Sequence, residues 1–205
     1  GYPEYFAKVL NATNWIAIDV LVDGEMVDLA KAKSIDFFKR ELDMRHGLLR
    51  REVELTLANG KRIRMESERF CSMAQPDVAA IRFTVTALSD EVEVTVRPGL
   101  DGDVFNEDSN WSDEFWKVDS VDASTAEGWA SVVNTTHKTA FTVATSMHAV
   151  IDSDQDFGAN ALVHEGNRIL ISRKGLLSQN QQVRVDKFIG LTSSLHHPIA
   201  AVADA

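Results

Sequence analysis

Apolar and polar residues alternate with a period of two along much of the chain, which is the pattern of a β-strand with one buried face. In residues 15–22 every second residue from Ile16 to Val22 is Ile or Val. Residues 48–57 and 91–96 alternate in the same way. Similar patterns predict further strands at 26–29, 62–68, 79–88, 128–134, 140–151, 161–164, 168–172, 183–189 and 191–195.

Glycine-containing turns separate several of these segments. Asp23-Gly24, Asn59-Gly60 and Glu165-Gly166-Asn167 are typical of β-hairpins, because glycine adopts a positive φ at low cost. Strands 79–88 and 91–96 are expected to form another pair, which Pro98-Gly99 ends. The best helix candidate, residues 30–42, is short and could equally be extended.

Short strands at this spacing, without long helical patterns between them, favour an antiparallel sandwich or barrel over a parallel α/β fold. We therefore predict the all-β class, an antiparallel β-sandwich with few short helices. The chain has 205 residues and shows neither an internal repeat nor a linker-like segment. Residues 1–205 are accordingly expected to form one domain.

The net charge of −10, from 31 acidic and 21 basic residues, opposes binding to nucleic acid or to an anionic membrane. No apolar run approaches the roughly 20 residues of a membrane-spanning helix. The single cysteine, Cys71, cannot form an internal disulfide, which predicts a reducing compartment such as the cytoplasm. We expect its thiol to be buried and inert.

Charge is distributed unevenly along the chain. Residues 101–127 contain nine acidic residues and one basic residue, whereas residues 31–70 contain eleven basic and seven acidic residues. The two segments could face each other across sheets.

The usual signatures of catalysis are missing from the sequence. It has no nucleophile elbow, no phosphate-binding glycine loop and no zinc-binding helix, so no catalytic and no metal-binding residue is assigned. Asp101-Gly102-Asp103 could begin a calcium loop, but its spacing favours a turn stabilised by Asp side chains. Trp111, Phe115 and Trp116 lie within the acidic segment, where aromatic faces and carboxylates could hold a sugar. Burial of these rings to pin a loop is the favoured alternative.

Four sequence blocks occur in an order and spacing that resemble the N-terminal domain of glycoside hydrolase family 65, the maltose, trehalose and kojibiose phosphorylases. The blocks are Asn11-Ala12 with Asn14-Trp15, then residues 41–50 (ELDMRHGLLR), residues 69–73 (RFCSM) and residues 100–108 (LDGDVFNED). Residues 1–6 and the pair Phe115-Trp116 most resemble the maltose phosphorylase branch.

The resemblance implies a galactose-mutarotase-like super-sandwich in a cytoplasmic bacterial enzyme of carbohydrate metabolism. Family members cleave an α-glucosidic disaccharide with inorganic phosphate as co-substrate, invert the anomeric centre and use no other cofactor. Their catalytic acid lies in an (α/α)6 barrel later in the sequence, so no catalytic residue can be assigned within residues 1–205. The chain is thus expected to be part of a longer glycosyltransferase-type enzyme, with its own C-terminal barrel as partner and a homodimer as the expected assembly.

Two functions are favoured at this stage over a third, a complete small enzyme such as a sandwich-fold epimerase acting through a His and Glu pair. The first is a non-catalytic domain that supports the barrel of an inverting disaccharide phosphorylase acting on maltose. The second is an independent carbohydrate-binding module that uses the aromatic residues. Candidate substrate-binding residues are Arg45, His46, Trp111 and Trp116. Arg45 and His46 could point toward the barrel, but pairing of the basic residues in this block with Glu41, Asp43 and Glu52 is favoured.

Overall fold

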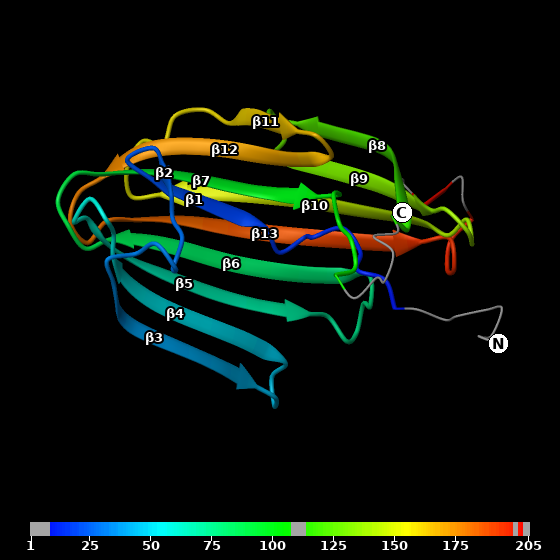
Figure 1. Ribbon diagram of the computed structural model, residues 1–205, viewed down its shortest axis with the longest axis horizontal. Helices are drawn as coiled ribbons and strands as arrows, with labels where there is room; N and C mark the ends of the chain where they lie inside the picture. The colour runs from blue at the N-terminus through cyan, green and yellow to red at the C-terminus, as the bar shows by residue number, and fades with distance from the viewer. Residues whose placement is uncertain (1–8, 108–113, 199–200, 203–205) are drawn as a thin grey trace.

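The structure, a computed structural model, describes residues 9–107, 114–198 and 201–202. In this part of the chain, thirteen strands form two stacked antiparallel sheets (Figure 1). The strands are β1 Ile18–Val22, β2 Glu25–Met26, β3 Ser34–Asp43, β4 Leu48–Thr56, β5 Arg62–Cys71, β6 Val78–Ala87, β7 Val92–Asp101, β8 Trp116–Ser124, β9 Trp129–Thr136, β10 Thr142–Ser153, β11 Ala161–Glu165, β12 Arg168–Leu177 and β13 Gln182–Ser193. Helix is almost absent from the described residues, and the predicted all-β sandwich is confirmed.

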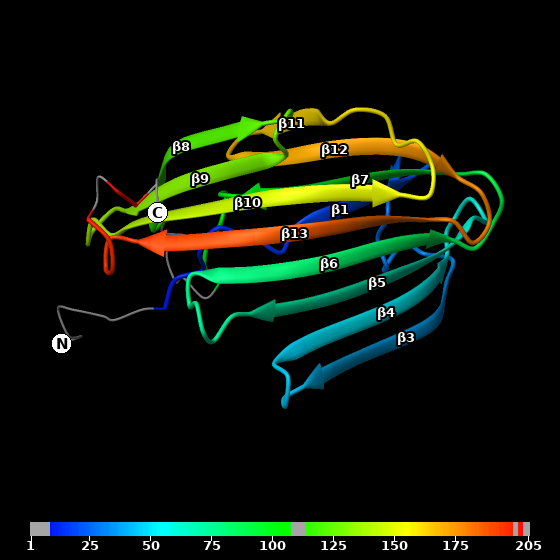
Figure 2. The same cartoon turned by 180° about the vertical axis from the view of Figure 1, so that it is seen from behind.

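The larger sheet has eight strands in the order β3-β4-β5-β6-β13-β10-β9-β8, and the smaller has five in the order β11-β12-β7-β1-β2. Figure 2 shows the larger sheet from behind, with β3 at one edge and β8 at the other. The smaller sheet lies behind its middle strands, and β3, β4 and β5 extend beyond it.

The core is built from the alternating positions of both sheets. Val53, Leu55 and Val85 from the larger sheet are fully buried, as are Val94 and Val96 from the smaller sheet. Their neighbours in sequence are polar and lie on the opposite face of each sheet, as the period-two rule requires, although Thr95 is also buried. Branched side chains at these positions suit the pleated surface.

The hairpin turns predicted at Asp23-Gly24, Asn59-Gly60 and Glu165-Gly166-Asn167 are confirmed, because the flanking strands pair in register. The expected pairing of residues 79–88 with 91–96 is wrong. These segments become β6 and β7, which belong to different sheets. Alternation defines the face that a strand buries but not its partner.

Pro98-Gly99 does not end β7, since the strand continues to Asp101 with Pro98 opposite Ile18. Gly99 is needed there because a Cβ at this position would lie 2.6 Å from the carbonyl oxygen of Ile169. The glycine marks a close approach of two backbones and not a turn.

Residues 34–43 form β3, so the helical interpretation of residues 30–42 is wrong and the extended alternative is correct. Pairing with β4 over nearly the whole strand outweighs the weak helical pattern. Strand β8, within the acidic segment, was not predicted, because only part of it alternates clearly. The acidic and basic segments do not face each other across sheets: β8 and β3 occupy opposite edges of the same sheet.

Lys187 on β13 connects the two layers from inside the core. Its side chain is fully buried, and Nζ donates hydrogen bonds to the carbonyl oxygens of Trp15 (2.7 Å), Ala17 (3.0 Å) and Gly99 (2.5 Å). Burial lowers the pKa of Lys187 to about 7, although the charge of Asp19 opposes the shift. The ammonium group therefore fixes the segment before β1 and strand β7 onto the larger sheet.

Candidate functional site

Residues 43–47, at the centre of the second sequence block, form the turn between β3 and β4. Asp43 Oδ1 accepts hydrogen bonds from the backbone N–H groups of Arg45 and His46, and Asp43 Oδ2 lies 2.7 Å from His46 Nδ1. These bonds to His46 lower the pKa of the Asp43 carboxyl. Gly47 has φ of +65°, which explains glycine at this position. The block therefore encodes a defined turn with an Asp at its centre.

The turn presents exposed side chains at one edge of the molecule. Met44 is 85% exposed and Leu42 is 60% exposed. Among the described residues, the Arg45 guanidinium has no hydrogen-bond or ion-pair partner. His46 pairs with Asp43, as was favoured from the sequence. An apolar and cationic tip of this kind is suited to contact with another surface.

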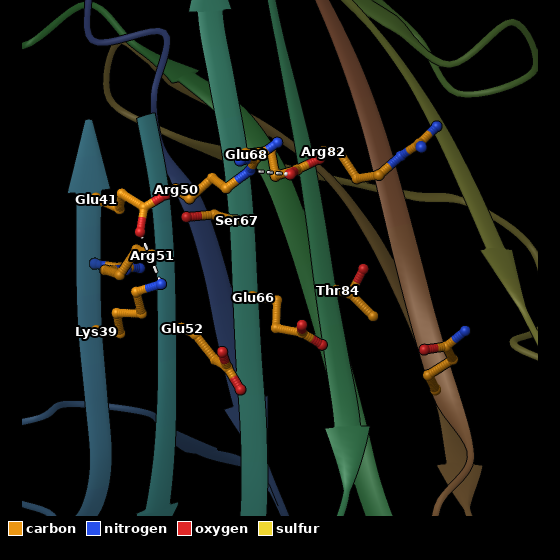
Figure 3. Close-up of a pocket in the computed structure, with 11 residues that line it drawn as sticks. Lys39, Glu41, Arg50, Arg51, Glu52, Glu66, Ser67, Glu68, Arg82 and Thr84 are labelled. Atoms are coloured by element: carbon orange, nitrogen blue, oxygen red, sulfur yellow. Dashed lines mark hydrogen bonds and ion pairs between the residues drawn. The ribbon is translucent and has the colours of Figure 1, made fainter. Parts of the chain in front are cut away.

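A shallow hollow of about 370 Å³ lies over the outer face of β3, β4, β5 and β6 (Figure 3). Lys39 Nζ pairs with Glu41 at 2.7 Å, and Arg50 Nε pairs with Glu68 at 2.7 Å. Arg50 thus pairs with Glu68 and not with one of the expected residues Glu41, Asp43 and Glu52. Two of the four basic side chains of the hollow are thus neutralised by its glutamates, Arg82 pairs with Asp186 outside it, and Arg51 has no ion-pair partner among the described residues.

Glu41, one of the glutamates of the hollow, does not have the properties of a general acid. Such an acid needs a raised pKa to carry a proton at neutral pH. Hydrogen bonding to Lys39 lowers the pKa of Glu41, and hydrogen bonding to Glu68 raises the pKa of Arg50. Both shifts favour permanent charges held in ion pairs.

Trp116 begins β8 at the opposite edge of the larger sheet. Its indole Nε1 donates a 2.7 Å hydrogen bond to the carbonyl oxygen of Asn11. Asn11 also donates to the carbonyl oxygen of Phe105 and to Asn106 Oδ1. The half-buried Trp116 ring therefore holds the N-terminal segment by a hydrogen bond, whereas the alternative favoured from the sequence was burial of the rings to pin the acidic loop. Trp111 lies outside the described residues.

Asp101-Gly102-Asp103 forms a turn stabilised by an Asp side chain, since Asp101 Oδ1 accepts from the Asp103 N–H. The Asp103 carboxylate in turn accepts from the Asn167 backbone and side-chain amides. The loop is thereby tied to the β11–β12 hairpin. In residues 9–107, 114–198 and 201–202, no three His, Cys, Asp or Glu side chains are grouped as metal ligands would be.

Cys71, at the end of β5, is exposed, so the expectation of a buried thiol is wrong. Cys71 is the last residue of β5 and lies opposite Ala79 of β6. Across the same described ranges, no helix is long and apolar enough to cross a membrane.

The four sequence blocks come together in pairs. The first and fourth are joined where Asn14 bridges Asp101, and the second and third pair across β4 and β5, with Leu49 opposite Arg69. Both pairs lie at the end of the sandwich that carries the β3–β4 turn (Figures 1 and 2). Arg45 and Trp116, however, sit on opposite edges of the larger sheet and do not form one site.

Sequence reasoning overlooked one buried lysine and a set of three arginines. Lys187 occupies an apolar position in the alternation of Val183, Val185 and Ile189, a signal that could have marked it. Three arginines on the inner face of β3, β4 and β5 were also missed, because their proximity depends on strand register.

The two stacked antiparallel sheets define the class of the protein as a β-sandwich domain. The sequence model of "Glycosyl hydrolase family 65, N-terminal domain" matches residues 1–205. The chain therefore belongs to this family, as its four sequence blocks indicated.

The relatives that the chain resembles include disaccharide phosphorylases. Maltose phosphorylase of Bacillus subtilis (strain 168) is 41% identical over 128 residues, which are 62% of this chain and 17% of that protein. Alpha,alpha-trehalose phosphorylase of Thermoanaerobacter brockii is 28% identical over 209 residues, covering 94% of this chain and 26% of that protein. The chain thus spans about a quarter or less of the length of these relatives.

A solved structure named "Putative kojibiose phosphorylase from human microbiome" superimposes with a TM-score of 0.75. The superposition covers 90% of this chain and 23% of the other, at 18% sequence identity. This likeness supports the sandwich fold.

Proposed function

We propose that the chain is the non-catalytic N-terminal domain of an inverting disaccharide phosphorylase that acts on maltose. The observation that carries this proposal is the family match over the whole chain. The 41% identity to a maltose phosphorylase supports maltose as the disaccharide. A cytoplasmic bacterial enzyme is part of the same proposal.

In the proposed reaction, inorganic phosphate attacks the anomeric carbon of one glucose unit while a carboxylic acid protonates the departing glycosidic oxygen from the opposite face. The products are β-glucose 1-phosphate and glucose. The acid belongs to an (α/α)6 barrel outside residues 1–205, and the mechanism requires no metal or organic cofactor. The role assigned to this chain is to support the barrel, with the exposed β3–β4 turn as a contact.

The test compares the 205-residue chain with the protein translated from the complete reading frame that contains it. We expect the complete protein to convert maltose and phosphate into equal amounts of glucose and β-glucose 1-phosphate. The chain alone should do neither this nor hydrolysis. Turnover by the chain alone would refute the non-catalytic role, and preference for trehalose or kojibiose would refute the maltose assignment.

A second candidate function, carbohydrate binding, is favoured by a row of rings on the outer face of the larger sheet. Strand register places Phe70, Phe188, His148 and Trp129 in line across β5, β13, β10 and β9, with Ala80 of β6 between the two phenylalanines. The rings of His148 and Phe188 stack with centroids 6.5 Å apart, and Phe188 is 51% exposed. Flat aromatic surfaces of this kind can pack against the C–H face of a sugar.

Calorimetric titration of the chain with maltose and longer maltooligosaccharides tests this second function. Binding that Phe188→Ala abolishes would support it. Phe105→Ala is the matched control, because Phe105 is exposed but lies away from the row. If the unmodified chain binds none of these sugars, the outer face is not a carbohydrate-binding surface.

A further inference from the structure

Three arginines gather on the inner face of the part of the larger sheet that extends past the smaller sheet. Arg40 of β3 lies directly opposite Arg51 of β4, and Arg51 lies opposite Ser67 of β5. Arg69 is two residues further along β5 and therefore diagonal to Arg51. Opposite Cβ atoms in a sheet lie about 5 Å apart and diagonal ones about 7 to 8 Å, so three long guanidinium side chains can reach one point.

These arginines border a hollow of about 200 Å³ between the segment around β1 and strands β3 to β6. Its polar lining consists of Arg40, Arg51, Arg69 and Ser67. The remaining wall is apolar and is formed by Ile16, Ile18, Leu49, Ile81 and Phe83. No carboxylate lines this hollow. Arg51 and Ser67 also line the outer hollow, which contains four glutamates.

The three guanidinium groups lack counterions among the residues that the structure describes. Arg50, Arg64 and Arg82, on the outer face of β4, β5 and β6, each pair with a carboxylate at 2.7 Å or less. Arg51 is half-buried, and its pKa is lowered by burial and then by the charges of Arg40 and Arg69. Like charges close to one another destabilise a fold. These three positive charges nevertheless lie together without counterions among the described residues, in a chain whose net charge is −10.

We propose that Arg40, Arg51 and Arg69 form a binding site for a phosphate-type oxyanion, taken as free phosphate or as the phosphate group of a sugar phosphate. Planar guanidinium groups bind such anions through paired N–H donors, and the Ser67 hydroxyl adds another donor. The apolar wall excludes water from one side and strengthens these interactions. Arg40 is already oriented by the Phe38 ring, whose centre is 5.8 Å from its Cζ. The site stands independently of the function proposed above.

Calorimetric titration of the 205-residue chain with inorganic phosphate, and separately with glucose 6-phosphate, tests the site. Sodium chloride at matched ionic strength is the reference. We expect saturable binding of one phosphate group per chain, and at least tenfold weaker binding by Arg51→Gln. Arg50→Gln is the control, because Arg50 is the adjacent residue on β4 but faces outward and pairs with Glu68. Its affinity should match that of the unmodified chain.

Thermal unfolding provides a second measurement that does not depend on the half-buried Arg51. Without phosphate and at low salt, the exposed substitution Arg40→Gln should not lower the midpoint, because it relieves repulsion between like charges. Phosphate should raise the midpoint of the unmodified chain more than that of Arg40→Gln. Equal effects of phosphate and chloride, or undiminished phosphate binding by Arg51→Gln and Arg40→Gln, would overturn the proposal. Tighter binding of glucose 6-phosphate than of phosphate would identify the sugar phosphate as the source.

Discussion

At the scale of single residues, the position of Lys187 is governed by its three carbonyl acceptors. The ammonium group lies among valines and isoleucines of the core, where an unpaired charge would be costly. Hydrogen bonds to the backbone of the other layer offset that cost. The residue therefore favours one alignment of the segment before β1 over others, since only this alignment brings the three oxygens together.

Substitution Lys187→Met should lower the free energy of unfolding by about 2 to 4 kcal/mol, because it removes three hydrogen bonds inside the core, and of the three acceptors Ala17 O keeps the Gly99 N–H as a donor. Chemical denaturation of the chain measures this change. The control Lys174→Met removes an exposed lysine that pairs with Glu93, and should change the value by less than about 1 kcal/mol. Equal stability of the two variants would refute the structural role of Lys187.

Stability should also depend on pH through this lysine. Its pKa is about 7 in the folded chain and near 10.5 when unfolded, so between these values the unfolded chain binds more protons. The free energy of unfolding should therefore gain a contribution as pH rises from 7 toward 10, and this contribution should be absent below pH 7. Denaturation curves at pH 7 and 9 for the unmodified chain and Lys187→Met would isolate it. Identical pH dependence in both would contradict the assignment.

Gly99 illustrates a constraint that acts through backbone packing. A Cβ would lie 2.6 Å from the Ile169 carbonyl oxygen and 2.7 Å from Leu170 Cγ, and both atoms belong to the paired strand β12. We expect Gly99→Ala to destabilise the chain by about 1 to 3 kcal/mol, the usual range for overpacking. Gly60→Ala is the comparison variant. A Cβ at Gly60 would meet no atom within 4 Å, so only the positive φ of +84° opposes this substitution. A thermal midpoint unchanged in Gly99→Ala would show that β7 and β12 can separate.

At the scale of elements, the edge strand β3 differs from the central strands. All but one of its ten residues are exposed, and β4 is its sole strand partner within the described chain. Ile35, Phe37, Phe38 and Leu42 are 41 to 60% exposed, a large apolar surface for an open edge. Such an edge favours pairing or coverage by another surface.

Hydrogen exchange should show this difference directly. Amides of β3 are expected to exchange much faster than those of β13, because β13 is paired on both sides and carries buried side chains. Mass spectrometry of the isolated chain measures the rates. Protection of β3 equal to that of β13 would indicate that another surface, such as a second copy, already covers the edge.

At the scale of the whole molecule, the fold was accessible from sequence to a considerable extent. Alternation at Val53, Leu55 and Val94 gave the strands and their buried faces, and Asn59-Gly60 gave the second hairpin. The distribution of strands between two sheets was not accessible. Ser89 to Glu91 looks like a hairpin turn, yet it carries the chain from one layer to the other.

The sequence located the candidate residues along the chain but not their positions relative to one another. The blocks around Arg45 and Trp116 were located from sequence, but their positions at opposite edges of one sheet were not. Sequence spacing contains no information on such distances, because β3 and β8 are separated by six other strands in the sheet.

In the complete protein, Arg45→Ala tests whether the β3–β4 turn contributes to function. Because the guanidinium has no described partner, its loss should leave the folded yield unchanged. If the turn contacts the catalytic part, we expect kcat/KM for maltose to fall by about tenfold, which corresponds to roughly 1.4 kcal/mol. Unchanged phosphorolysis at normal yield would remove Arg45 from any functional role.

The homodimer remains a prediction, and sedimentation of the complete protein measures it.

By itself the sequence determined the all-β class, the buried face of most strands and the family to which the chain belongs. The tertiary structure alone decided which strands share a sheet, why a lysine occupies the core and where three arginines without counterions among the described residues lie close together. The physical reason is that a period-two pattern records whether a side chain faces water, whereas partners and register depend on contacts between residues distant in the chain.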